Sequence, residues 1–208
     1  MIVITACFRR ETRWIDRRVE SRIVHTRMGS AAASDLGRLV QDESVDALIS
    51  TGFCGGLDEA LRMGDVVLAE TIRYEGRDVI VSPELLSLAA AALEETVPRM
   101  QRGHVVTVQR VATPEDKRAL AEKGYTAVDM ESGPLARWAA DRGLPFLSIR
   151  TVLDLRDESI PFSSASMAWS VLRHPRATAG VARASKIAGR MLGLGVSAVV
   201  DAWAVREI

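Results

Sequence analysis

Acidic residues stand at the ends of two apolar runs in the second half of the sequence. Asp129 and Glu131 close the run "TAVDME", and Asp154 follows "FLSIRTVL". If these runs are parallel neighbouring strands, the carboxylates meet at the carboxyl ends of the strands, where open α/β sheets bind ligands. Two carboxylates in a partly apolar cleft can divide acid–base work. One stays ionised and accepts hydrogen bonds, while the other has a raised pKa and donates a proton.

Each acid also has a structural explanation. An acidic residue in the first turn of a helix is stabilised by the helix dipole, which would account for Glu131. Asp154 is equally explained as a turn residue or as the ion-pair partner of Arg150 or Arg156. A further acid, Glu11, follows the first apolar run, where it fits either a solvated helix start or the same sheet edge.

Three glycines in "STGFCGG" follow another apolar run: Gly52, Gly55 and Gly56. Because a glycine has no side chain, the sugar or phosphate of a ligand can approach the backbone closely there. The same residues are also typical of ordinary turns, and their spacing does not match a dinucleotide-binding fingerprint. The glycines therefore indicate either a turn or a ligand-binding edge, and they disfavour a dinucleotide-dependent oxidoreductase.

Short β-branched runs alternate with helical patterns along the chain. The predicted strands are 2–8, 22–28, 46–51, 65–72, 104–108, 126–130 and 146–152, and the predicted helices are 30–43, 82–97, 113–124 and 131–143. This alternation predicts an α/β sandwich with a largely parallel sheet. The sequence has no internal repeat and no Pro/Ser-rich linker, so we expect a single domain over residues 1–208.

The pattern changes after residue 154. Residues 155–169 are predicted as a polar loop entering a helix and 174–195 as an amphipathic helix, so 161–208 is expected to be a C-terminal helical region. Such a region packs on a sheet face, or forms a partner surface or a substrate lid. The apolar run 191–205 is short for a membrane span and contains Asp201, which favours a buried or interfacial helix. Association with a membrane surface stays open.

The composition limits the classes of partner. The chain has 208 residues, 27 Lys plus Arg and 27 Asp plus Glu, so no net field favours nucleic acid or an anionic membrane. Cys7 and Cys54 lie in apolar contexts without metal-ligand spacing, which is typical of a reduced cytosolic chain. The opening "MIVITACF" is typical of a first strand and unlike a signal peptide, so we expect a cytoplasmic protein.

Two segments together resemble a known family. "STGFCGGLDEALRMGDVVLAE" and, further on, "VDMESGPLARWAADRGLPFLSIRTVLD" are similar to the nucleoside phosphorylase and nucleosidase superfamily, which includes purine nucleoside phosphorylases and methylthioadenosine/S-adenosylhomocysteine nucleosidases. The resemblance runs in the same order from the first strand to residue 154. It implies a three-layer α/β/α sandwich around a twisted mixed sheet and cleavage of the N-glycosidic bond of a purine nucleoside. It also implies a homo-oligomer without metal or other cofactor.

The resemblance also assigns roles to residues. Glu131 matches the carboxylate that accepts the ribose hydroxyls, and Met130 matches the residue that packs on the sugar. Asp154 matches the acid that protonates the purine or holds its protonated N7. Glu11 matches the residue that positions or deprotonates the attacking water, and Arg150 matches an arginine that orients the acidic loop. The predicted substrate-binding residues also include Asp129, Gly52, Phe53 and Gly55.

The sequence departs from the phosphorylases at the phosphate site. Where many of them have an arginine and a serine, this chain has Ser50 and Phe53. A phosphate dianion needs charge-assisted donors, and the Glu11 carboxylate would repel it, so hydrolysis is preferred over phosphorolysis. The alternatives are phosphorolysis with inorganic phosphate as co-substrate, aided by Arg9, Arg10 or a neighbouring subunit, and a non-catalytic nucleoside-binding protein.

Three segments point to one branch of the superfamily. "TVQRVATPEDK", "VDMESGPLAR" and "VLRHPRATAGVARASK" are more similar to the branch associated with hopanoid biosynthesis, which removes adenine from adenosylhopane. The base-side segment lacks the serine and aspartate of other members. This likeness implies a lipophilic nucleoside, for which an apolar C-terminal region with Trp169 and Trp203 is suited. Core or oligomer packing explains the same apolar helices.

Overall fold

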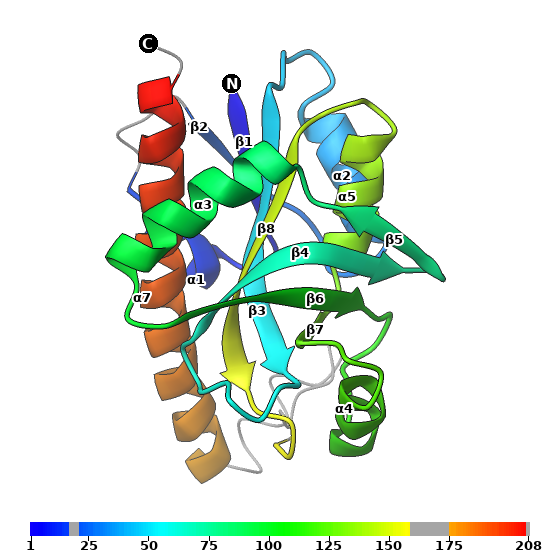
Figure 1. Ribbon diagram of the computed structural model, residues 1–208, viewed down its shortest axis with the longest axis vertical. Coiled ribbons are helices and arrows are strands. Elements are labelled where there is room, and N and C mark those ends of the chain that lie inside the picture. The colour runs from blue at the N-terminus through cyan, green and yellow to red at the C-terminus, as the bar shows by residue number, and fades with distance from the viewer. Residues whose placement is uncertain (17–20, 159–174, 207–208) are drawn as a thin grey trace.

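Eight strands form one sheet in this computed structural model, which describes residues 1–16, 21–158 and 175–206 (Figure 1). The strands are β1 (Ile2–Ala6), β2 (Ser21–His25), β3 (Ala47–Gly56), β4 (Val66–Tyr74), β5 (Arg77–Ile80), β6 (Met100–Thr107), β7 (Ala127–Asp129) and β8 (Phe146–Asp154). The pairs β1–β2, β1–β3, β3–β8, β4–β6 and β6–β7 are parallel, and β3–β7, β4–β8 and β4–β5 are antiparallel. The sheet is therefore mixed, with parallel pairs in the majority.

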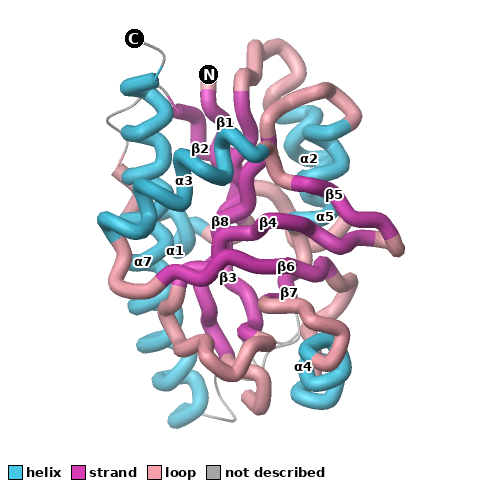
Figure 2. The backbone as a smooth tube through the Cα atoms, viewed as in Figure 1, coloured by secondary structure: helices cyan, strands magenta, loops and turns pink. Residues whose placement is uncertain are grey.

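Helices cover both faces of this sheet. One layer contains α1 (Arg9–Thr12), α3 (Pro83–Thr96) and α7 (Pro175–Arg206), and the other contains α2 (Ala31–Leu39) and α5 (Ser132–Ala140). Figure 2 shows the strands as the middle layer between them. Within the described part of the chain, a further helix, α4 (Pro114–Ala121), lies at the end of the molecule where β3 and β8 finish (Figure 1). The predicted three-layer α/β/α sandwich is confirmed.

The hydrophobic core follows from this layering. Strands covered on both faces need apolar side chains on both, and every residue of β1 is buried. On α7 the buried residues recur at three-to-four spacing: Ala184, Ala188, Leu192, Val196, Val199 and Val200. The stretch Ala182–Val205 has the length and composition of a membrane span, but here α7 packs on β8, α3 and α1 as a core helix.

Some elements differ from the prediction. β5 was missed because it is a short charged edge strand, joined to β4 by a tight turn at Glu75 and Gly76, both with positive φ. β3 continues through the glycines to Gly56 instead of ending in a turn. Of the predicted loop and helix at 155–169, only 155–158 lies within the described residues, so Trp169 falls outside them.

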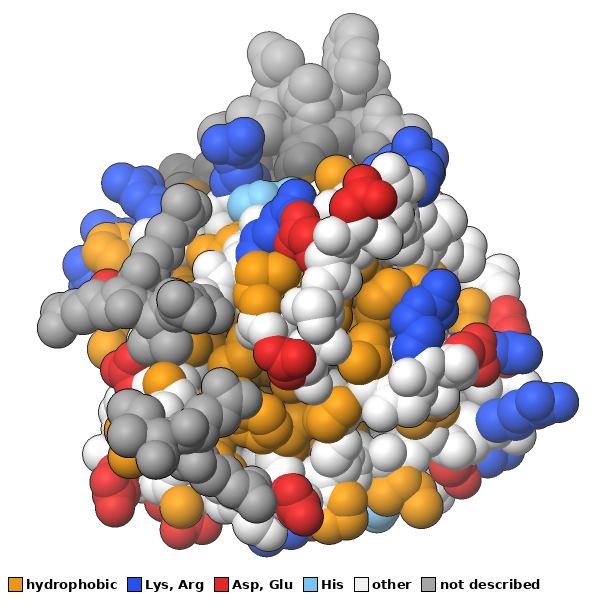
Figure 3. Space-filling model, turned by 90° about the horizontal axis from the view of Figure 1, so that it is seen from above, with side chains coloured by type: hydrophobic (Ala, Val, Ile, Leu, Met, Phe, Trp, Pro, Cys, Tyr) orange, Lys and Arg blue, Asp and Glu red, His pale blue; other side chains and the backbone are white. Residues whose placement is uncertain are grey.

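The face of the molecule seen from above carries charges of both signs. Figure 3 shows Lys, Arg, Asp and Glu side chains intermixed on that face, with hydrophobic side chains between them. This distribution matches the formal net charge of zero.

Candidate active site

A cavity of about 210 Å³ lies at the ends of β1, β3, β7 and β8. The wall of the cavity brings together most of the predicted site residues: Glu11, Phe53, Gly55, Asp129, Met130, Glu131 and Asp154. Gly52 and Arg150 are not in the wall. They lie directly behind the lining residues, next to Glu11, so in this structure they support the wall and do not face the cavity.

The acids converge by a different route from the one predicted. β7 and β8 are not parallel neighbours, because β3 lies between them and pairs antiparallel with β7 and parallel with β8. Gly55 of β3 is in register with Val128 on one side and with Asp154 on the other. The acids after β7 and at the end of β8 therefore face one cavity across the end of β3.

Glu11 is held by backbone N–H groups. It is 3% exposed, and its Oε2 accepts hydrogen bonds from the backbone N–H groups of Cys7 (3.0 Å) and Phe8 (2.8 Å). Its Oε1 accepts one from the N–H of Phe53 at 3.2 Å. Burial raises the pKa of this carboxyl, while these N–H donors and nearby Arg150 oppose the rise. A fixed carboxylate on the wall that prefers a proton more than usual is suited to act as a base.

A buried guanidinium organises the other acids. Arg150 is 1% exposed, and its Nε lies 2.8 Å from Asp129 Oδ2. Arg150 Nη2 donates to the hydroxyls of Ser132 (2.8 Å) and Ser50 (2.6 Å). Burial lowers the pKa of Arg150, but the charges of Asp129, Glu131 and Glu11 outweigh this and raise it. Arg150 therefore stays charged behind three carboxylates.

Asp129 is fully engaged within the protein. Its Oδ1 accepts from the hydroxyl of Thr107 at 2.6 Å and its Oδ2 accepts from the backbone N–H of Ser132 at 3.0 Å, in addition to its ion pair with Arg150. It touches the cavity, but its hydrogen-bonding capacity is used to fix the start of α5. Glu131 lies between Asp129 and Ser132, so this clamp sets its position.

Glu131 faces the cavity with few partners of its own. It is the residue directly before α5, and its side chain makes no capping hydrogen bond to the helix. Its Oε1 accepts one long hydrogen bond, 3.4 Å, from the backbone N–H of Gly29. Burial raises the pKa of Glu131 to about 7, and Asp129 adds repulsion that Arg150 partly offsets. Hydroxyl donors from a ligand would favour its ionised form.

Asp154 pairs with a residue that sequence reasoning missed. Its partner is Lys117 of α4, not Arg150 or Arg156. Burial raises the pKa of Asp154, and the hydrogen bond and charge of Lys117 lower it. The available signal for Lys117 was its place in a helical pattern, three and four residues before Leu120 and Ala121, which pack in a small apolar cluster.

The glycines make room for these charged side chains. A methyl group on Gly52 would lie 2.5 Å from Arg150 Nη1 and 3.1 Å from Glu11 Oε1. One on Gly55 would lie 3.0 Å from Lys117 Cε and 3.1 Å from Val128 Cγ1. The expected close approach is therefore present, but at both positions the approaching groups belong to the protein itself.

The rest of the wall is mainly apolar and was also missed. It includes Phe8, Met28, Val108, Val111, Ala112 and Leu153. Cys7 and Cys54 also line the cavity as free thiols, and burial raises the pKa of both, which disfavours their reactive thiolates. Within residues 1–16, 21–158 and 175–206, no group of three or more His, Cys, Asp or Glu side chains is arranged to hold a metal ion.

A comparison with protein families identifies the family of this chain. Residues 8–169 match the Phosphorylase superfamily, and the chain belongs to this family. The resemblance inferred from the two motifs, and with it the prediction of an enzyme class, is confirmed at the level of the family.

Solved structures share the fold at low sequence identity. A 5′-methylthioadenosine/S-adenosylhomocysteine nucleosidase from Neisseria meningitidis, in complex with methylthio-immucillin-A, is 18% identical, with 96% of this chain and 97% of that chain covered and a TM-score of 0.77. The corresponding nucleosidase from S. pneumoniae, bound to a transition-state inhibitor, is 20% identical, with 97% and 99% covered and a TM-score of 0.76. Futalosine hydrolase of Helicobacter pylori is 16% identical, with 96% and 97% covered and a TM-score of 0.76.

Gly52→Ala tests the packing behind the wall. We expect a loss of about 2 kcal/mol or more in the free energy of unfolding, because the methyl group displaces Arg150 or Glu11. Gly76→Ala is the control, since Gly76 has φ +76° and nothing within 4 Å, so it reports only the left-handed conformation. Denaturant unfolding of both variants gives the comparison. Equal losses at the two positions would contradict the proposed crowding.

Glu131→Gln tests how much stability the protein loses when the partly buried Glu131 carboxyl ionises. Its pKa is about 7 in the folded protein against an ordinary 4.5, so the folded state binds the proton more tightly than the unfolded state. The Glu131 carboxyl therefore contributes a loss of stability as the pH rises from 4.5 to 7, and the glutamine variant lacks this contribution. We expect the difference to grow in favour of the variant by about 1–3 kcal/mol between acidic and mildly alkaline pH.

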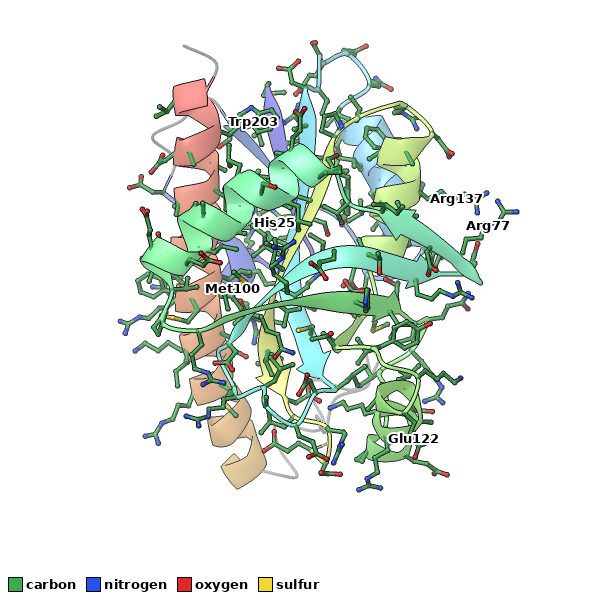
Figure 4. All side chains as sticks on the ribbon, viewed as in Figure 1. His25, Arg77, Met100, Glu122, Arg137 and Trp203 are labelled. Carbon is green, nitrogen blue, oxygen red and sulfur yellow. The ribbon has the colours of Figure 1, made fainter. Side chains whose placement is uncertain are left out.

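Denaturant unfolding as a function of pH measures this difference. Glu122→Gln is the control, because Glu122 is exposed and projects from the end of α4 (Figure 4). It should follow the pH dependence of the wild type. Parallel stability curves for Glu131→Gln and the wild type would show that Glu131 titrates as an ordinary glutamate.

Proposed function

We propose that the protein hydrolyses the N-glycosidic bond of an adenosine-type nucleoside. The observation that carries this proposal is the convergence of three carboxyl side chains, the buried Glu11 and Asp154 and the partly buried Glu131, on one mainly apolar cavity. Breaking the bond between sugar and base leaves positive charge on the sugar and negative charge on the base. The reaction therefore needs a carboxylate near the sugar and a proton donor near the base.

Each carboxyl group has an environment suited to one part of the reaction. Glu131, whose side chain has one weak protein partner, accepts hydrogen bonds from the ribose hydroxyls, with Met130 against the sugar. Asp154, on the opposite side of β3, delivers a proton to the departing base. Glu11, fixed by three backbone N–H groups, orients and deprotonates the attacking water. The water's oxygen bonds to the sugar carbon as the electron pair of the broken bond moves to the base.

Water is preferred over phosphate because of the groups around Glu11. The N–H of Phe53 already binds Glu11, and Ser50 is fully buried beside Arg150 and does not line the cavity, so neither serves a phosphate. Arg150 lies behind the wall and not on it. Arg10 does line the cavity and supports phosphorolysis as the second candidate, with inorganic phosphate as co-substrate. Arg9 is not among the lining residues.

The similar structures support the same reaction. Those compared above are described as nucleosidases or as a hydrolase, and an aspartate-to-asparagine variant of the Helicobacter pylori nucleosidase contains 5′-methylthioadenosine in its active site. An aspartate whose replacement accompanies an intact bound substrate is consistent with the role proposed for Asp154.

The cavity wall supports a lipophilic substituent on the nucleoside, as in adenosylhopane. The support comes from the apolar residues Phe8, Met28 and Leu153 in the wall. It does not come from Trp203, which lies near the end of α7 farthest from the ends of β3 and β8 (Figure 4). Homo-oligomer formation, a cytoplasmic location and association with a membrane surface stay predictions.

Two substitutions test the reaction. Asp154→Asn should lower kcat for adenine release by about 10²–10⁴-fold with ligand binding retained, because the proton donor is lost. Glu131→Gln should raise KM by weakening ribose recognition. Adenine release from adenosine, 5′-methylthioadenosine and adenosylhopane measures both, with the exposed Asp201→Asn as control. Undiminished turnover in both variants would refute the assignment, and wild type that binds these nucleosides without releasing adenine would indicate a binding protein.

The products of a simple nucleoside identify the nucleophile. With adenosine we expect free ribose, at a rate independent of added phosphate, and we expect Glu11→Gln to lower that rate by about 10²-fold or more. Chromatography of the sugar product with and without phosphate makes the measurement. Formation of ribose 1-phosphate, or turnover that requires phosphate, would establish the phosphorylase alternative.

A further inference from the structure

Lys117 is a buried charged residue in the cavity wall that the reaction above does not use. It lies on α4, it is 1% exposed, and it lines the cavity together with Asp154. Its Nζ donates to Asp154 Oδ2 and to the backbone carbonyl oxygens of Leu155 at 2.9 Å and Glu158 at 3.0 Å. These three acceptors match the three protons of an ammonium group. The contacts therefore fix a charged Lys117 against the proposed acid.

The fold holds Lys117 in this place by a defined helix start. Thr113 precedes α4, and its hydroxyl accepts from the N–H of Asp116 at 3.2 Å, while the Asp116 carboxylate accepts from the N–H of Thr113 at 2.8 Å. Asp116 also binds Arg110 through both carboxylate oxygens. The first turn of α4 is thus fixed directly before Lys117. Because Gly55 has no side chain, the Lys117 side chain can approach β3 closely at this position.

Stability alone is a weak reason for this pair. Removing two charges from water costs several kcal/mol per ion, and apolar residues of similar volume often replace a buried pair without loss. Val128, which forms an apolar cluster with Leu57 and Val106, lies beside the same face of Gly55 as Lys117 Cε. A buried charged pair that lines a cavity is a candidate functional group.

The pair also creates a chemical requirement. Burial raises the pKa of Asp154, the hydrogen bond and charge of Lys117 oppose this rise and favour the ionised form, and whenever Asp154 is ionised it has no proton to give to a base. The adjacent Lys117 has one. The proton that leaves with the base must therefore be replaced on Asp154 from a group within hydrogen-bond reach, and Lys117 Nζ is within that reach.

We propose that Lys117 is the source of the proton that Asp154 transfers to the departing base. This inference rests on the proposed function. As the bond between sugar and base breaks, its electron pair goes to the base. Asp154 gives a proton to a base nitrogen, and Lys117 gives one to Asp154 and becomes a neutral amine. The attacking water loses a proton to Glu11 and from there to solvent, and Lys117 regains one from solvent. The net reaction consumes one nucleoside and one water.

Other charged groups around the pair are already engaged. Glu158 accepts a hydrogen bond from the N–H of Leu155 at 2.9 Å, and its charge raises the pKa of Asp154. Three ion pairs lie nearby. Arg110 and Asp129 of the cavity wall pair with Asp116 and Arg150, which are not in the wall, and the exposed Arg118 and Asp157 pair with each other. Cys54 also faces the cavity, with its thiol protonated by burial. Among the described residues, Lys117 is the cation in direct contact with Asp154.

The test compares two substrates that differ in their need for a proton. Adenosine has a leaving group that requires protonation, whereas 4-nitrophenyl β-D-ribofuranoside releases a stable anion. Lys117→Met should lower kcat for adenosine by about 10²-fold or more and change kcat for the nitrophenyl riboside by less than about 5-fold. It should also move the alkaline limb of the kcat/KM profile for adenosine to lower pH, because Asp154 must then hold its own proton.

Two further variants separate charge, structure and proton transfer. Lys117→Arg keeps the charge but cannot release a proton, so it should behave like Lys117→Met on adenosine. Lys123→Met, at an exposed lysine just after α4, should match the wild type. If Lys117→Met does not fold by circular dichroism, the pH profile and substrate ratio of Lys117→Arg decide the question.

Each result bears on a separate claim. Suppose that the wild type cleaves adenosine but the Lys117 variants lose equal activity on both substrates, or keep the alkaline limb of the wild type. Either result would overturn the role of Lys117 and leave the proposed function standing. Full activity of Lys117→Arg would show that charge alone suffices and would also overturn it. Wild type that cleaves neither substrate would remove the proposed function, and this inference with it.

Discussion

The site depends on one buried cation. Arg150 carries its charge in the middle of the sheet, where it faces Asp129, Glu131 and Glu11 and is almost inaccessible to water. Without this guanidinium, three acids would lie in a low-dielectric region with no compensating charge, and such a state costs several kcal/mol. The other features of the site are ways of reaching this arginine or of making space for it.

Strand β3 provides most of the space for these charged side chains. It lies between β7 and β8, so the acids after β7 and at the end of β8 approach each other only across its last residues. Gly52 gives room to Arg150 and Glu11, and Gly55 gives room to Lys117. Side chains at these two positions would collide with the charged groups on either face. The glycine-rich end of β3 is therefore a requirement of the electrostatic arrangement as well as of the backbone.

Much of this arrangement could be predicted from the sequence, but only where a pattern is local. The alternation of apolar runs and helices identified the sandwich, and the acids after two strands identified Glu131 and Asp154 as neighbours of one site. The order of strands is not a local property, so the separation of β7 from β8 by β3 could not be inferred. β5 was missed because its charged residues lack the alternation of a half-buried strand. Lys117 was missed because a lysine in a polar helix is usually exposed, and its burial depends on an aspartate 37 residues away.

The two cationic groups differ in a way that matches two kinds of work. Arg150 is sealed behind the wall, holds its proton at every accessible pH and fixes Asp129 and the start of α5, so it is suited to a permanent structural charge. Lys117 opens onto the cavity beside Asp154, and in the role proposed for it the charge of the side chain changes during the reaction. Exchanging the two residue types would place a proton donor where none is needed and a fixed charge where the reaction needs a mobile proton. The raised pKa values of Glu11, Glu131 and Asp154 follow from the same design, since acids that are costly to ionise in the folded protein gain most from a ligand that brings hydrogen-bond donors or developing charge.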